Sequence, residues 1–141
     1  MSSFVDTNVL LYAVSTAGDE ANKRKVARDI LERDDLVLSV QVLQEFYAQA
    51  TRPTKPDRLE HEPATALIES WLRFRVMETT VALVQSALAS ALRWRISYWD
   101  AAIVEAARFG GCPTLLSEDL QSGMSFAGVT VVNPFAAQGA G

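Results

Sequence analysis

The chain has 141 residues, carries a formal net charge of −4 at pH 7 and is 49% hydrophobic. This length fits one domain whose core is large enough to fold without disulfides or a structural metal. The negative charge excludes a protein that coats nucleic acid through charge alone. The single cysteine, Cys112, excludes an intrachain disulfide, and no Cys/His spacing indicates zinc.

The amino terminus has no positively charged segment of the kind that begins a secretory signal, and Asp6 interrupts its apolar stretch. No apolar run approaches the roughly 18 residues that a membrane span requires. We therefore expect a cytoplasmic protein without a membrane segment. Cys112 is expected to be a small buried residue beside a strand.

Apolar runs alternate with helical periodicities along the chain. The runs predict strands at 2–6, 36–39, 75–78, 114–117 and 129–132. The periodicities predict helices at 8–15, 19–35, 40–52, 64–74, 81–95 and 97–109, with a proline-rich loop at 51–63. Strands that alternate with helices indicate an α/β fold of three layers, α/β/α, with a mainly parallel central sheet. We expect one domain over residues 1–135 and a disordered tail at 136–141.

Four acids stand near the predicted edge of this sheet. Asp6 directly follows the first strand, and Asp119 follows the strand at 114–117. Asp100 lies in the first turn of a helix, and Glu45 lies on the helix after the second strand. Ligands of open α/β sheets bind at the carboxyl ends of the strands, beside helix N-termini. The four positions therefore favour one shared site.

Each acid also has an ordinary structural interpretation. Asp6 can cap the first helix, and Asp100 can complete a capping box that begins at Ser97. Asp119 can stand in a polar turn, and Glu45 on a helix surface. One shared site explains all four positions together, whereas the ordinary interpretations need a separate explanation for each.

Carboxylates that converge need a cation, because like charges a few ångströms apart raise one another's pKa. Oxygen ligands favour Mg²⁺ or Mn²⁺ over zinc. Such an ion orients a phosphodiester, neutralises charge on the phosphoryl oxygens and lowers the pKa of a bound water. Asn8 and Ser117 could add neutral oxygens or hold waters around it. The one histidine, His61, is expected to be exposed in the proline-rich loop, which excludes a two-histidine mechanism.

Five stretches carry a resemblance that covers nearly the whole chain in order. They are FVDTNVLLYA, LQEFYAQATR, SYWDAAIVEAA, LLSEDLQSGMSF and VVNPF. Together they resemble the PIN-domain ribonucleases, and in particular the VapC-type toxins of type II toxin–antitoxin systems.

The resemblance implies that Asp6, Glu45, Asp100 and Asp119 form an acidic quartet around one or two Mg²⁺ or Mn²⁺ ions. It implies that Asp6 and Asp100 are direct ligands, that Asp119 is a further ligand and that Glu45 acts through water. It also implies endonucleolytic hydrolysis of RNA, homodimerisation and inhibition by a small antitoxin protein. Glu118 is a fifth acid nearby, and we rank Asp119 ahead of it as the residue that points inward.

An acidic pocket that accepts RNA should be bordered by positive charge. The candidates are Lys23, Arg24, Lys25, Arg28, Arg52, Lys55, Arg58, Arg93 and Arg95. Three aromatic residues, Trp94, Tyr98 and Trp99, stand close to Asp100. For these, packing in the core or at a dimer surface is favoured over base stacking.

Three other functions remain open. An aspartyl phosphatase usually carries a second acid two residues after the first, where this chain has Asn8. A phosphorylation-receiver domain generally uses a late lysine, and no lysine follows Lys55. A non-catalytic PIN-like binding or regulatory domain would keep the fold without activity, and an activity assay separates it from a nuclease.

Overall fold

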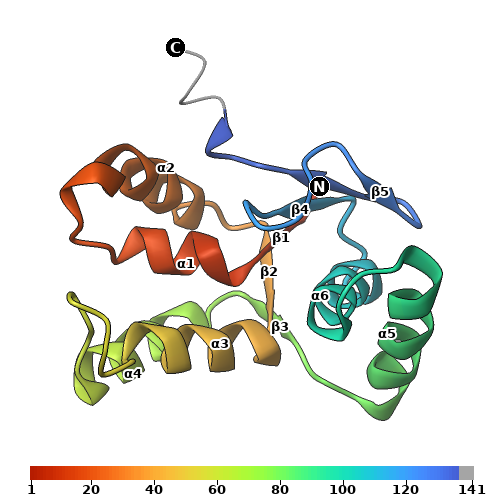
Figure 1. The fold of residues 1–141 in the computed structure, drawn as a ribbon, viewed down its shortest axis with the longest axis horizontal. Coiled ribbons are helices and arrows are strands. Elements are labelled where there is room, and N and C mark those ends of the chain that lie inside the picture. The colour runs from red at the N-terminus through yellow and green to blue at the C-terminus, as the bar shows by residue number, and fades with distance from the viewer. Residues whose placement is uncertain (137–141) are drawn as a thin grey trace.

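A six-stranded sheet forms the centre of the computed structural model, which describes residues 1–136 (Figure 1). The strand order is β3-β2-β1-β4-β6-β5, and neighbours pair in parallel except that β5 runs antiparallel to β6. The strands are β1 (Ser3–Val5), β2 (Leu36–Ser39), β3 (Arg75–Met77), β4 (Thr114–Leu116), β5 (Ser125–Phe126) and β6 (Val129–Val132). The predicted mainly parallel sheet is confirmed.

Helices cover both faces of this sheet, which confirms the three predicted layers. They are α1 (Thr7–Ala13), α2 (Ala21–Leu31), α3 (Val40–Ala50), α4 (His61–Trp71), α5 (Val81–Trp94) and α6 (Tyr98–Phe109), with a short 3₁₀ segment η1 (Gly18–Glu20). Figure 1 shows α1 to α4 on one side of the sheet and α5 and α6 on the other. Right-handed crossovers produce this division, because the chain moves outward from β1 to β3 and then returns to β4.

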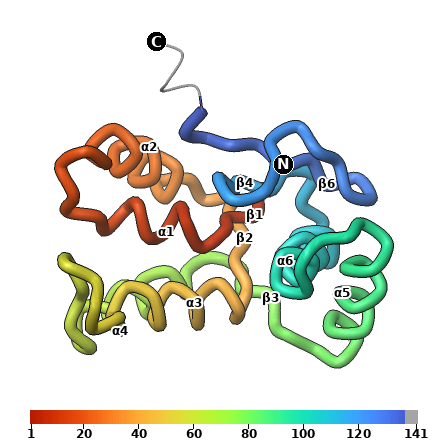
Figure 2. The backbone as a smooth tube through the Cα atoms, viewed as in Figure 1, coloured from red at the N-terminus to blue at the C-terminus, as the bar shows by residue number. Residues whose placement is uncertain are grey.

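The helix pairs α1–α2 and α3–α4 lie next to each other, and α1 contacts α3 (Figure 2). On the other face, α6 lies between the sheet and α5, so every residue from Ala101 to Ala107 is buried. The strands contribute fully buried side chains such as Phe4, Leu38 and Leu115. This burial fixes the carboxyl ends of the central strands relative to the helices that follow them.

Side-chain caps start several helices at the ends of strands. Asp6 accepts a hydrogen bond from the Thr7 N–H, and Ser39 caps α3. The Ser97 hydroxyl accepts from the Asp100 N–H at 3.0 Å, as the predicted capping box requires of its first residue. These caps place Asp6 at the start of α1 and Asp100 in the first turn of α6, both beside the sheet.

The predicted boundaries differ from the structure where polar residues continue a helix. The proline-rich loop ends at Glu60, and α4 begins at His61, so His61 is a helical residue and not the loop residue expected. Pro63 fits the first turn of α4, because N–H groups there have no acceptor within the helix. His61 is exposed as expected, and its Nδ1 lies 2.9 Å from the Tyr47 hydroxyl.

Cys112 is 2% exposed and lies beside β4, which confirms the prediction of a buried residue there. Within residues 1–136, none of the helices has the length and the apolar character to cross a membrane. Of the tail predicted at 136–141, residues 137–141 lie outside the described residues.

Candidate active site

A cavity of about 340 Å³ lies at the carboxyl ends of β1 and β4. Its lining includes all four acids singled out in the sequence, Asp6, Glu45, Asp100 and Asp119. In the sheet, β1 stands between β2 and β4, where the order of the strands reverses direction. Such a reversal point is where open α/β sheets bind their ligands.

Asp6 is the most enclosed of these acids, with 6% of its surface exposed. Its Oδ1 accepts a hydrogen bond from the Thr7 N–H at 2.7 Å, and its Oδ2 accepts one from the Ser117 hydroxyl at 2.7 Å. Burial raises the pKa of Asp6 to about 6; the charges of Asp119 and Glu45 add to the rise, and the two hydrogen bonds oppose it. Asp6 is therefore both a helix cap and a strongly perturbed carboxylate.

Ser117 and Asn8 connect the end of β1 to the loop that follows β4. Ser117 is fully buried, and its hydroxyl accepts hydrogen bonds from the Asn8 side-chain amide at 3.3 Å and from the Asp119 N–H at 3.1 Å. Asn8 Oδ1 in turn accepts from the Glu118 N–H at 3.2 Å. The two residues expected to support the acids therefore hold Asp6 and the loop after β4 together.

Glu45 reaches the cavity from α3. The Thr7 hydroxyl donates to Glu45 Oε1 at 2.7 Å, and the Gln41 amide donates to Oε2 at 3.4 Å. The same amide also donates to the Trp99 carbonyl oxygen at 3.2 Å. The sequence did not identify Thr7 and Gln41 as residues of the site. The hydroxyl of Thr7 follows Asp6 directly, and the ordinary interpretation of that position is part of a helix cap.

Asp100 and Asp119 complete the acidic lining. Asp100 is half-buried in the first turn of α6, whereas Asp119 is exposed in the loop after β4. Asp119 lies close enough to Asp6 that its charge contributes to the raised pKa of Asp6. The structure thus brings together acids from four separate segments of the chain.

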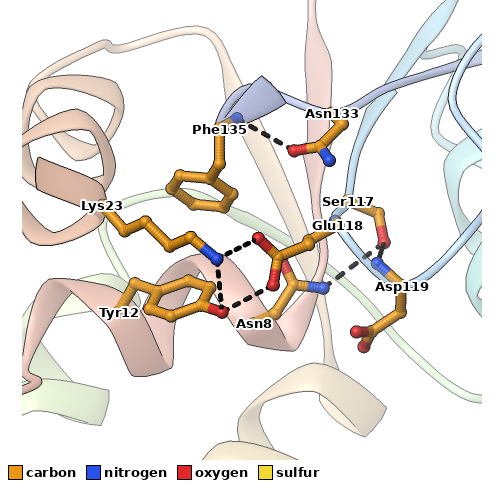
Figure 3. Close-up of polar contacts among 8 residues, drawn as sticks. All are labelled: Asn8, Tyr12, Lys23, Ser117, Glu118, Asp119, Asn133 and Phe135. Carbon is orange, nitrogen blue, oxygen red and sulfur yellow. Dashed lines mark hydrogen bonds and ion pairs between the residues drawn. The ribbon is translucent and has the colours of Figure 1, made fainter. Parts of the chain in front are cut away.

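Glu118 lies at the same cavity but has a positive partner. Its carboxylate accepts hydrogen bonds from Lys23 Nζ at 2.8 Å and from the Tyr12 hydroxyl at 2.5 Å (Figure 3). Burial alone would raise the pKa of Glu118, but the bonds from Lys23 and Tyr12 outweigh burial and lower it. Figure 3 shows the Asp119 carboxylate apart from this cluster.

The basic residues proposed to border the pocket include two that bond to backbone carbonyls and one that lines the cavity. Arg24 and Arg28 donate to the carbonyl oxygens of Ser15 and Ala13, so they satisfy the end of α1. Lys55 instead lines the cavity itself, from the loop between α3 and α4. Lys55 Nζ lies 2.5 Å from Asp57.

The oxygen donors at this site fit a hydrated divalent cation. Among residues 1–136, no three carboxylate, imidazole or thiol side chains converge closely enough to enclose an ion on their own. Mg²⁺ usually binds one or two carboxylates and keeps several waters, so an open cavity lined by separate carboxylates suits it. The buried Asp6 carboxylate also needs a positive partner in its ionised form.

The model of one protein family, the PIN domain, matches residues 3–122. That span contains all four acids and ends in the loop after β4. A comparison with curated proteins finds no match.

Three solved structures share this fold at low sequence identity. A toxin–antitoxin complex from Klebsiella pneumoniae is 17% identical, with a TM-score of 0.70, over 94% of this chain and 98% of that chain. VapC20 from Mycobacterium tuberculosis, described as a sarcin–ricin loop cleaving toxin, is 21% identical, with a TM-score of 0.66, over 84% and 92%. FitAcB from Neisseria gonorrhoeae is 18% identical, with a TM-score of 0.63, over 95% and 99%.

The PIN-domain model thus matches most of the chain, and the matched part contains the acids that gather at the carboxyl ends of β1 and β4. The resemblance read from the five sequence stretches is confirmed at the level of the family. This chain belongs to the PIN-domain family.

Proposed function

We propose that the protein is a Mg²⁺- or Mn²⁺-dependent endoribonuclease that hydrolyses RNA phosphodiester bonds. The observation that carries this proposal is the cavity that Asp6, Glu45, Asp100 and Asp119 line together, with Asp6 almost fully buried. Membership of the PIN-domain family supports the same activity. A set of carboxylates without histidine or cysteine is typical of sites for hard cations.

Asp6, Asp100 and Asp119 are the residues that would hold the cation, each directly or through one of the waters that the ion keeps, with Glu45 also acting through water. When bound there, Mg²⁺ or Mn²⁺ would neutralise charge that develops on the phosphoryl oxygens and lower the pKa of an attacking water. Ser117 and the Thr7 N–H keep the Asp6 carboxylate in one orientation. The Thr7 hydroxyl does the same for Glu45 by donating to its Oε1, and Glu45 would then reach the cation through a water.

We also propose that this ribonuclease is the toxin of a toxin–antitoxin pair, that it forms a homodimer and that it acts in the cytoplasm. Support comes from the fold shared with structures described as a toxin or a toxin–antitoxin complex. An antitoxin could insert an arginine, whose guanidinium matches a group of carboxylates in charge and geometry. Expression of the chain alone should arrest growth, and co-expression with a small protein encoded beside it should restore growth.

The test of the catalytic proposal is cleavage of single-stranded RNA by purified protein with Mg²⁺, Mn²⁺ or EDTA. Asp6→Asn and Asp100→Asn should abolish cleavage and weaken binding of Mn²⁺ in calorimetry, while circular dichroism stays unchanged. Asp34→Asn is the matched control, because Asp34 is exposed just before the amino end of β2, whereas the cavity lies at the carboxyl ends of the strands. Full cleavage by Asp100→Asn would defeat the assignment, and Mn²⁺ binding without cleavage would favour a non-catalytic PIN-like domain.

A further inference from the structure

The three aromatic residues near Asp100 have different surroundings in the structure. Trp94 packs edge-on against Phe126, with ring centroids 5.0 Å apart, and Tyr98 is half-buried. Trp99 is 62% exposed, and it lines the acidic cavity. Of the large apolar side chains that are exposed in residues 1–136, Trp99 is the one found in the lining of this cavity.

Trp99 has one backbone contact and one ring contact, although its ring is exposed. Its backbone lies in the first turn of α6, and its carbonyl oxygen accepts the hydrogen bond from Gln41. The ring meets Tyr98 edge-on, with centroids 5.0 Å apart and an interplanar angle of 82°. The side chain of tryptophan has two rotatable bonds, so it loses little conformational freedom when a ligand covers it.

The remaining lining combines acidic side chains with a single lysine. Six acids line the cavity, Asp6, Glu20, Glu45, Asp100, Glu118 and Asp119. Lys55 is the one basic residue in the lining, and the Asp57 carboxylate holds its nitrogen in place. A cavity with an aromatic surface and the acids proposed to hold Mg²⁺ or Mn²⁺ suits a ligand that has both a base and a phosphate, because the bound cation would offset the charge of the acids.

We infer that Trp99 stacks on an unpaired base of the RNA, next to the phosphodiester that is cleaved. This inference rests on the proposed ribonuclease function. Any base can stack on an indole ring, so the contact selects for strandedness and not for sequence. In a duplex, both faces of a base are already covered by neighbouring bases, and Trp99 gains no contact there.

Binding can be measured without cleavage in an Asp6→Asn background, with a fluorescent single-stranded RNA ten nucleotides long and with the duplex of the same sequence. Adding Trp99→Leu should weaken single-strand binding about tenfold and leave the weaker duplex binding unchanged. Trp99→Phe should restore most of the affinity. In the active protein, Trp99→Leu should raise KM for the single strand with kcat within about twofold. Leu92→Ala is the control, because Leu92 is 83% exposed on α5 and lies outside the cavity lining.

Unchanged single-strand binding by the Trp99→Leu protein would overturn the inference, as would an equal loss for the duplex. A change in sedimentation coefficient without a change in RNA binding would assign Trp99 to an interface between copies. Loss of binding to an arginine-rich peptide with intact RNA binding would assign it to a protein partner. If the wild type cleaves no RNA, the proposed function fails; if it cleaves and Trp99→Leu matches it, only this inference fails.

Discussion

Lys23 Nζ on α2 lies 2.8 Å from Oε2 of Glu118 in the loop after β4, 95 positions further along the chain. The two side chains are 38% and 26% exposed, so water screens their attraction in part. We expect a double-mutant cycle of Lys23→Met and Glu118→Gln in urea denaturation to give a coupling free energy of about 0.5–1 kcal/mol.

The Lys25–Asp29 pair on the same helix is the matched control for that cycle. Its side chains are 79% and 69% exposed, and its N–O distance is 3.4 Å. Its coupling should therefore be smaller than that of Lys23 and Glu118. Equal coupling in the two pairs would show that Lys23 does not anchor the loop.

The raised pKa of Asp6 predicts that its contribution to the stability of the metal-free protein falls as pH rises. Asp6 titrates at about 6 in the folded state against 3.8 without burial, so the native state holds the extra proton between these values. The Asp6 contribution to the free energy of unfolding should fall by about 2–3 kcal/mol from pH 4 to pH 7. Urea denaturation in EDTA should show this fall as the difference between the wild type and Asp6→Asn.

Asp6→Asn should remove that pH dependence, because the amide does not titrate. Mn²⁺ should restore stability to the wild type at pH 7 and have little effect on Asp6→Asn, since a ligand that binds the native state stabilises it. An identical pH profile for the two proteins would contradict the burial of an ionisable Asp6.

Ser117→Ala should weaken the link between the ends of β1 and β4. The Ser117 hydroxyl donates to Asp6 and accepts from Asn8, so its loss leaves buried polar groups with fewer partners. We expect the free energy of unfolding to decrease by about 1–3 kcal/mol. The pKa of Asp6 should rise further, because the lost bond had lowered it. Carboxyl NMR titration measures the second effect, and Ser117→Thr, which keeps a hydroxyl, should leave the pKa near its wild-type value.

Thr7→Val should disturb the site without removing an acid. The Thr7 hydroxyl orients Glu45 through a 2.7 Å hydrogen bond, and valine has nearly the same shape without the donor. Cleavage or Mn²⁺ affinity should fall about 10- to 100-fold, the usual effect of losing such support. Calorimetry and the RNA assay measure the two quantities, and Thr7→Ser should recover most of the loss. A valine variant as active as the wild type would show that Glu45 needs no such orientation.

The sequence predicts the place of the acids because strand ends are visible in it. A parallel sheet puts the carboxyl ends of its strands at one edge, so Asp6 and Asp119 follow from strand positions alone. The structure also places Asp100 in the first turn of α6, as the Ser97 cap indicates. That part of the site depends on local patterns, which a single sequence contains.

Contacts between distant segments were less visible. The partners of Glu118 come from α1 and α2, and no local pattern links Lys23 to a loop 95 positions away. Tyr98 is half-buried whereas the adjacent Trp99 is exposed. This difference depends on how α6 packs, which the sequence around the two residues does not contain. The two-residue strand β5 was also missed, because a hairpin through Ala127 and Gly128 leaves too short an apolar run.

The short outer strands of the sheet affect how molecules meet one another. β5 has two residues, and β3, at the opposite border, has three and includes the exposed Arg75. Outer strands this short, one of them bearing a charge, give a neighbouring molecule little backbone to pair with, which protects against aggregation by sheet extension. The apolar side chains Leu88 and Leu92 that face solvent lie instead on a helix, α5, so a helix surface offers a neighbouring molecule more apolar area than these strands do.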